Sequence, residues 1–179
     1  MKKLLFILLI QFTFGNEITI NLVTTNDVHG FIEPQRAYFM NPQYPPNIIG
    51  GSAFYKYVQE LKQESNKNDE GLLILDGGNF FQGTELGMFD KGLSMIEWMN
   101  YVGYDAIVPG RYDFIFGIDN LDLLTQRANF EFLGANIECN VCLPEMKPYI
   151  IKEVEGINIG ILGIVNSSIP DYISSSQLS

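Results

Sequence analysis

The sequence LLILDGG at residues 72–78 decides the fold class. Four consecutive aliphatic residues predict a short strand that is buried on both faces, as in sheets covered by helices. Gly77 and Gly78 end this strand, because glycine breaks regular structure. In folds built from such strands, functional residues lie on the loops just past the carboxyl ends of the strands. The segment that begins at Asp76 is therefore a candidate part of a site.

Strand-like and helix-like patterns alternate on both sides of this stretch. Further strands are predicted at 18–25, 106–108 and 130–133, and apolar residues at helical spacing predict helices over 52–61, 95–102 and 118–128. Ser52 is the predicted N-cap of the first helix, and 65–70 is predicted to be a polar link. Residues 149–154 and 157–165 flank the turn Glu155-Gly156, which is typical of a hairpin. The pattern predicts an α/β layered core with a mixed sheet.

Composition limits the function classes that fit the chain. Its 179 residues are enough for one ordinary domain, and 46% of them are apolar, which is enough for a packed core. The net charge of −10 disfavours binding to nucleic acid, because an acidic surface repels the phosphate backbone. One histidine and two cysteines are too few for a His-rich metal site or a disulfide scaffold.

The first fifteen residues have the layout of a secretory signal peptide. Lys2 and Lys3 precede the apolar run 4–10, and Thr13-Phe14-Gly15 provides small residues at the cleavage-determining positions. A membrane anchor is the alternative, but the apolar run is much shorter than the roughly 20 residues that span a bilayer. We expect residues 1–15 to be removed and the rest to be exported to the periplasm or the extracellular space, without stable membrane insertion.

Three strand-end loops carry the polar candidates, at 26–30, 76–83 and 109–114. Asp27 and His29 are two residues apart, so both side chains can lean toward the same side. A carboxylate and an imidazole form half of a site for Zn²⁺ or Mn²⁺. A hydrogen-bonded structural pair is the alternative interpretation of these two residues.

Read together, the loops resemble the 5′-nucleotidase branch of the calcineurin-like metallophosphoesterases. The family pattern T-N-D-x-H-G corresponds to TNDVHG at 25–30, G-D-x-x-x-G-T to GNFFQGT at 78–84, and G-N-H-[DE]-F to GRYDF at 110–114. The likeness runs from about Ile18 to Val165, in the order and at the spacing of the family. It implies a layered α/β sandwich and a two-metal phosphohydrolase that cleaves phosphate monoesters of nucleotides with a metal-activated water.

Five positions carry the site residues that the resemblance implies. Asp27 and His29 match two metal ligands of the family. Asn79 replaces its bridging Asp, Arg111 replaces its Asn ligand, and Tyr112 replaces its catalytic His. Asn79 lacks the charge that holds two dications together, and a guanidinium has no acceptor atom for a metal. We therefore expect at most one weakly bound divalent ion, Zn²⁺ or Mn²⁺, and weak or absent catalysis.

Two alternatives to an enzyme follow from these replacements. The chain is then either an exported pseudoenzyme that binds phosphate or a nucleotide through Arg111, or a truncated fragment without function. The resemblance also implies further His ligands and a C-terminal nucleotide-recognition domain downstream, so we expect residues 16–179 to be a partial catalytic domain. Cys139 and Cys142 are close in sequence within a predicted loop, and a local disulfide is the favoured interpretation in an exported protein.

Overall fold

A parallel sheet of four strands forms the centre of the computed structural model, which describes residues 17–137 and 146–167. Its order is β1-β4-β5-β6, so the sheet grows in one direction along the chain. The strands are β1 (Ile20–Thr25), β4 (Gly71–Asp76), β5 (Ala106–Ile107) and β6 (Glu131–Phe132). All three pairings are parallel, which places the carboxyl ends of the strands at one edge.

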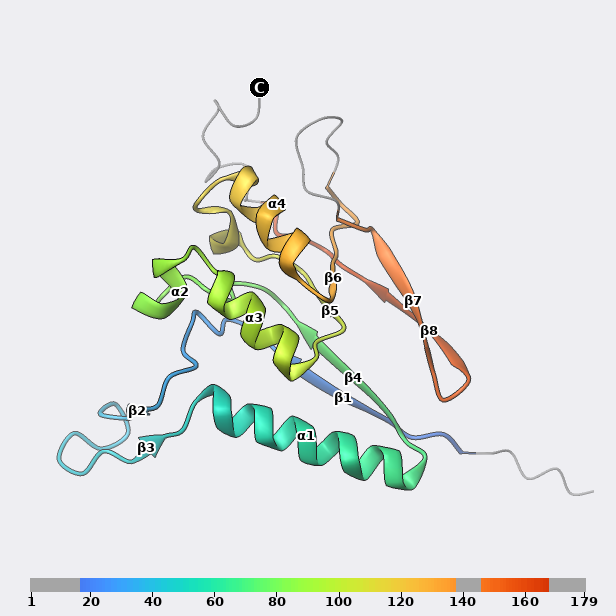
Figure 1. Cartoon of the computed structure of the whole chain (residues 1–179), viewed down its shortest axis with the longest axis horizontal. Coiled ribbons are helices and arrows are strands. Elements are labelled where there is room, and N and C mark those ends of the chain that lie inside the picture. Colours follow the sequence, from blue (N-terminus) through green and yellow to red (C-terminus); the bar gives the residue numbers. More distant parts are fainter. Residues whose placement is uncertain (1–16, 138–145, 168–179) are drawn as a thin grey trace, which may run out of the picture.

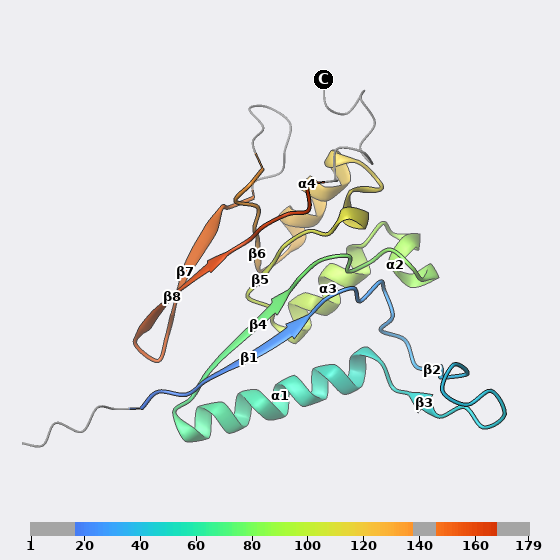
Figure 2. The ribbon, with the colours of Figure 1, turned by 180° about the vertical axis from the view of Figure 1, so that it is seen from behind.

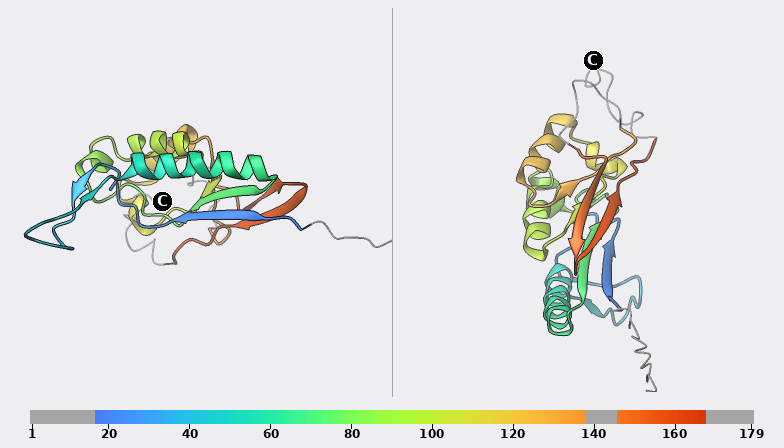
Figure 3. Two further views of the ribbon diagram at one scale, coloured as in Figure 1. Left: turned by 90° about the horizontal axis from the view of Figure 1, so that it is seen from below. Right: turned by 90° about the vertical axis from the view of Figure 1, so that its right-hand side faces the viewer.

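Helices cover one face of this sheet, as Figure 3 shows from below. They are α1 (Gly51–Asn68), α2 (Glu85–Phe89), α3 (Leu93–Val102) and α4 (Ile118–Arg127), with a 3₁₀ helix η1 at Arg111–Phe114. In Figure 2 the strands lie in front of these helices. Between helices and sheet lies the core, whose fully buried members include Val58, Phe80, Phe81, Met95, Met99 and Leu121. The apolar helical positions therefore pack inward, as their spacing predicts.

Two antiparallel pairs complete the described part of the chain. The strands β2 (Gln35–Arg36) and β3 (Asn47–Ile48) form a small projection beyond α1 (Figure 1). The strands β7 (Tyr149–Val154) and β8 (Ile157–Leu162) form the predicted hairpin, with Glu155 at φ 48° and Gly156 at φ 74° in its turn. The chain thus combines a parallel core with antiparallel pairs, which confirms the predicted fold class.

Some predicted boundaries were wrong for identifiable reasons. The N-cap of α1 is Gly50 at φ 76°, not Ser52, which lies inside the first turn. The helix also continues to Asn68 through the predicted link, because Ser65 is buried and accepts a hydrogen bond from Asn21 Nδ2 at 3.1 Å. Asp69 then ends the helix in the left-handed conformation. The last strand stops at Leu162 rather than Val165.

Two predictions concern residues outside this description. The predicted signal peptide and the cysteines Cys139 and Cys142 both lie outside the described residues. Within the described ranges, no helix has the length and apolar character that crossing a membrane requires.

Candidate functional site

The five candidate side chains lie together at the carboxyl edge of the parallel sheet. Asp27 and His29 follow β1, Asn79 follows β4, and Arg111 and Tyr112 open η1 after β5. Backbone bonds join the first two loops, since Asp27 N donates to Gly78 O at 3.0 Å and His29 N to Asn79 O at 2.9 Å. The parallel strand order therefore produces the cluster that the loop positions predict.

Asn79 occupies the middle of this cluster. Its amide Nδ2 donates to Asp27 Oδ1 at 2.7 Å, and its Oδ1 accepts from the backbone N of Tyr112 at 2.9 Å. Both ends of the amide are therefore used, one toward each neighbouring loop. Its backbone lies at φ 57°, in the left-handed region that Asn and Asp tolerate better than most residues.

His29 presents one ring nitrogen toward Asp27. Its Nδ1 lies 2.6 Å from the carbonyl oxygen of Gln82, which can only accept, so Nδ1 carries the proton. Nε2 is on the other side of the ring and lies 3.8 Å from Asp27 Oδ1. The ring also lies 5.9 Å from that of Tyr112, measured between centroids. The pair offers one carboxylate and one imidazole nitrogen to a ligand.

The Arg111 guanidinium lies against the side chain of Tyr112. Its Nη2 donates to the Tyr112 hydroxyl at 2.5 Å, and its Cζ lies 4.6 Å from the centroid of the ring. Stacking of this kind holds a cation over the negative face of an aromatic ring. It places a permanent positive charge at the rim of the cluster, next to a hydroxyl group.

A buried carboxylate supports the cluster from below. Asp113 is fully buried and accepts hydrogen bonds from the backbone N atoms of Asn79, Phe80 and Gly110, at 2.7, 3.0 and 2.8 Å. Desolvation by burial raises the pKa of its carboxyl to about 7, although the three donors work in the opposite direction. Asp113 thereby ties the loop after β4 to the loop after β5.

A second buried carboxylate, Asp76, holds the ends of β1 and β4. It accepts from Thr25 Oγ1 at 2.5 Å and from Gly78 N at 2.7 Å. The Thr25 hydroxyl in turn accepts from Tyr104, whose oxygen lies 2.8 Å away. Burial raises the pKa of Asp76 to about 6 and also raises the pKa of Tyr104. The sequence places Asp76 and Asp113 beside the site, but their roles as backbone acceptors depend on burial and could not be inferred from the motifs.

Known proteins resemble this chain in sequence and in fold. No family model matches it. A curated relative, the 5′-nucleotidase of Rattus norvegicus, is 31% identical over 158 residues, which cover 84% of this chain and 27% of the relative. The crystal structure of a 5′-nucleotidase precursor from Thermus thermophilus matches with a TM-score of 0.69 and 25% identity, over 83% of this chain and 29% of that one.

A calcineurin-like phosphoesterase from Bacillus subtilis has the same fold, with a TM-score of 0.59 and 23% identity, over 84% of this chain and 49% of that one. In sequence the chain resembles 5′-nucleotidases, and its fold is the one shared by 5′-nucleotidases and calcineurin-like phosphoesterases. It spans about a quarter of the length of the curated relative.

The family of this 5′-nucleotidase-like chain implies a divalent metal ion, and its ligands would have to come from the side chains of this site. Within the described residues, no group of three or more His, Cys, Asp and Glu side chains is placed to hold a metal ion. Asn79 directs its NH₂ group at Asp27 and its oxygen at the Tyr112 backbone, so neither end offers a free ligand at the bridging position. Asp27 and His29 supply two ligands for one ion, and the described residues do not fit a pair.

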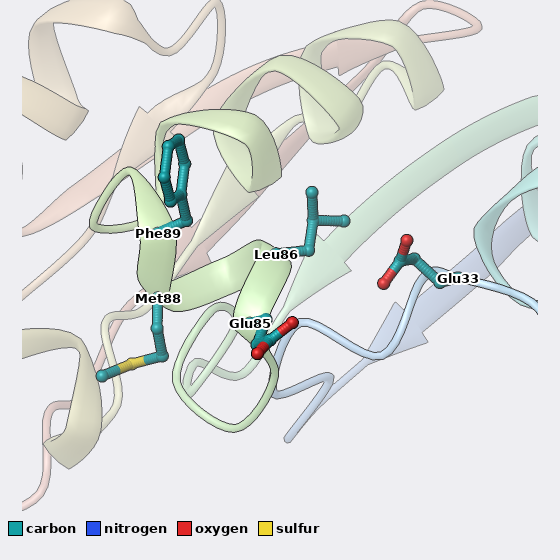
Figure 4. A pocket seen from close by; sticks show the side chains of 5 residues that line it. All are labelled: Glu33, Glu85, Leu86, Met88 and Phe89. Atoms are coloured by element: carbon teal, nitrogen blue, oxygen red, sulfur yellow. The ribbon is translucent and has the colours of Figure 1, made fainter.

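Two hollows lie near the site of the 5′-nucleotidase-like chain. One, of about 620 Å³, is lined by Glu33 and by residues of α2, where Leu86 points toward Glu33 and Met88 away from it (Figure 4). The other, of about 320 Å³, includes Asn26 and Asp76 and is lined mostly by apolar side chains of the sheet and β8. None of the five candidate residues lines either hollow.

Proposed function

We propose that this chain is an exported 5′-nucleotidase-like protein whose strand-end cluster receives the phosphate group of a nucleotide, and whose hydrolysis of phosphate monoesters is weak or absent. Residues 16–179 form its partial phosphoesterase domain. Asp27 and His29 are the proposed ligands of at most one Zn²⁺ or Mn²⁺ ion, and Arg111 is the proposed phosphate-binding residue. The likeness to nucleotidases supports the substrate class.

The hydrogen bonding of Asn79 is the observation that carries this proposal. A bridging carboxylate balances part of the charge of two dications, whereas the Asn79 amide is neutral and already bonded at both ends. Arg111 adds a second obstacle, because a guanidinium about 4 Å from a dication raises the energy by roughly 8 kcal/mol at an effective dielectric constant near 20. Tyr112 offers a phenol hydroxyl in place of the imidazole of the family's histidine, so it does not supply a cationic proton donor.

Release of inorganic phosphate from AMP tests the hydrolytic part of the proposal. The folded chain is incubated with AMP and either Mn²⁺ or Zn²⁺, beside an Asp27→Ala control. We expect phosphate release within a few-fold of the control. Turnover well above the control, at rates of about 1 s⁻¹ or more as in ordinary enzymes, would show that the departures at positions 79, 111 and 112 leave the reaction intact.

A second candidate function is metal-independent binding of phosphate or a nucleotide through Arg111. The contact of its guanidinium with the Tyr112 hydroxyl favours this function, because it places two groups that can donate to a phosphate side by side. Calorimetry with AMP and with inorganic phosphate, each with and without EDTA, tests it. We expect binding that EDTA does not change and that Arg111→Ala abolishes. Binding that requires a metal would contradict this candidate.

Export rests on the layout of residues 1–15 and has its own test. Expression of the full chain in a cell with a secretory pathway, followed by N-terminal sequencing of the secreted product, should show a mature terminus near Asn16. Retention of the full chain in the cytoplasm would contradict export.

A further inference from the structure

The geometry points to a structural role for the Asn79 amide: it takes the place of a bridging metal ion by tying the Asp27 side chain to the backbone of η1, so that the site is assembled without metal. This inference does not depend on whether the chain hydrolyses or binds nucleotides. The Asn79 amide holds the Asp27 side chain and the Tyr112 backbone at hydrogen-bond distance from residue 79.

The side chain of Asn79 bonds to both neighbouring loops. Toward the loop after β1 it donates to Asp27 Oδ1 at 2.7 Å, and toward η1 it accepts from Tyr112 N at 2.9 Å. Its own backbone N is held by Asp113 Oδ2 at 2.7 Å. Gly110 leaves room for this arrangement, because a Cβ at that position would collide with the Asn79 amide.

The NH₂ group of Asn79 determines whether the link forms without a metal ion. The Asp27 carboxylate needs a positive or hydrogen-bearing partner, and Asn79 supplies an N–H at hydrogen-bond distance. An aspartate at position 79 would instead place a second carboxylate oxygen at about the same distance from Asp27. Two carboxylates that close repel each other at neutral pH unless a cation or a proton lies between them. Asn79 therefore allows the loops to close in the absence of either.

The inference predicts opposite metal responses for the natural chain and for Asn79→Asp. Asp tolerates the left-handed backbone of position 79 much as Asn does, so the substitution changes the charge without adding backbone strain. For the natural chain at pH 7.5, the melting temperature should be the same within about 1 °C in EDTA and in Mn²⁺. For Asn79→Asp we expect a loss of roughly 5 °C in EDTA, and we expect Mn²⁺ to restore most of it.

A matched control is available at Asn136. Its side chain also bonds at both ends, donating to Val165 O and accepting from Val165 N, each at 2.8 Å, with no carboxylate among these partners. Asn136→Asp should therefore lower the melting temperature without any recovery in Mn²⁺. Metal recovery in this control would mean that Mn²⁺ acts elsewhere, which would overturn the inference.

The exchanged pair gives an independent test. In the double variant Asp27→Asn plus Asn79→Asp, the amide and the carboxylate change places, and the melting temperature in EDTA should return to within about 2 °C of the natural value. The inference is overturned if the natural chain gains several degrees in Mn²⁺. It is also overturned if Asn79→Asp melts like the natural chain in EDTA, or fails to fold in both EDTA and Mn²⁺.

Discussion

Two groups of residues at the carboxyl edge of the sheet differ in chemistry. The support layer consists of Asp76 and Asp113, and the site layer consists of the five candidate residues. In the support layer, the buried Asp76 and Asp113 accept hydrogen bonds from backbone and side-chain donors of the strand ends. In the site layer, Asp27 is exposed and meets the amide of Asn79. The support layer agrees with the family pattern at Asp113, whereas the site layer departs from it at Asn79, Arg111 and Tyr112.

Loop placement and site chemistry are therefore separable in this fold. The support layer joins the three loops through bonds that run largely to backbone atoms, which any loop sequence provides, and the Asn79 amide adds a link on top of it. The residues above it can then change without loss of the architecture. Most of the stability should depend on the support layer, whereas ligand binding should depend on the site layer.

The largest effect is expected from Asp113→Ala. Three backbone N–H groups, one buried and two partly buried, would lose their acceptor, and we expect the free energy of unfolding to fall by about 4 kcal/mol. Urea unfolding followed by circular dichroism measures it. Glu64→Ala, on the exposed side of α1, is the control and should change the value by less than about 0.5 kcal/mol. A loss of less than about 1 kcal/mol for Asp113→Ala would show that Asp113 does not hold the loops together.

The pH dependence of stability is the second test of that layer. Burial raises the pKa of Asp76 to about 6 and that of Asp113 to about 7, above the ordinary 3.8 of an unfolded aspartate. The folded chain therefore binds these two protons more tightly than the unfolded chain does. The stability that the two groups contribute is fully present below about pH 4 and is lost as the pH rises toward 7. We expect the free energy of unfolding to fall continuously across this range in urea unfolding. Asp76→Asn and Asp113→Asn should each flatten the profile, and a rise of stability across this range would contradict the assignment.

The two layers also differ in how far the sequence predicts them. The apolar run 72–75 and the turn Glu155-Gly156 predict β4 and the hairpin, because burial and turn chemistry are local properties. Ser52 is misleading as a cap, since the close approach of Gly50 to Ile32 fixes where α1 begins. The motifs identify all five site positions, but the bond from Tyr112 N to Asn79 joins residues 33 apart and depends on how the loops meet.

In the site layer, a smaller effect is expected from Arg111→Lys. Lysine keeps the charge but loses the planar fork that contacts phosphate with two N–H groups. We expect affinity for AMP to fall about fivefold in calorimetry, with unchanged unfolding free energy. Lys91→Ala removes a different cation, the one over Phe116, and should leave AMP affinity as it is. Equal affinities for the natural chain and Arg111→Lys would show that the guanidinium does not hold the phosphate.

The smallest effect is expected from Asp27→Asn. Asn accepts a hydrogen bond from Asn79 Nδ2 as Asp does and tolerates the backbone of position 27 at φ 54°. The free energy of unfolding should change by about 0.5 kcal/mol or less in the same urea experiment. If the free energy of unfolding fell as much as in Asp113→Ala, the site layer would contribute as much to stability as the support layer does, which would contradict the distinction between them.

The metal content of the purified, folded chain shows whether the site is assembled without metal. Elemental analysis after exchange into metal-free buffer should find less than one tightly held divalent ion per chain, because Asn79 bonds with both ends of its amide where the family has a bridging carboxylate. Two tightly held transition-metal ions per chain would contradict the account.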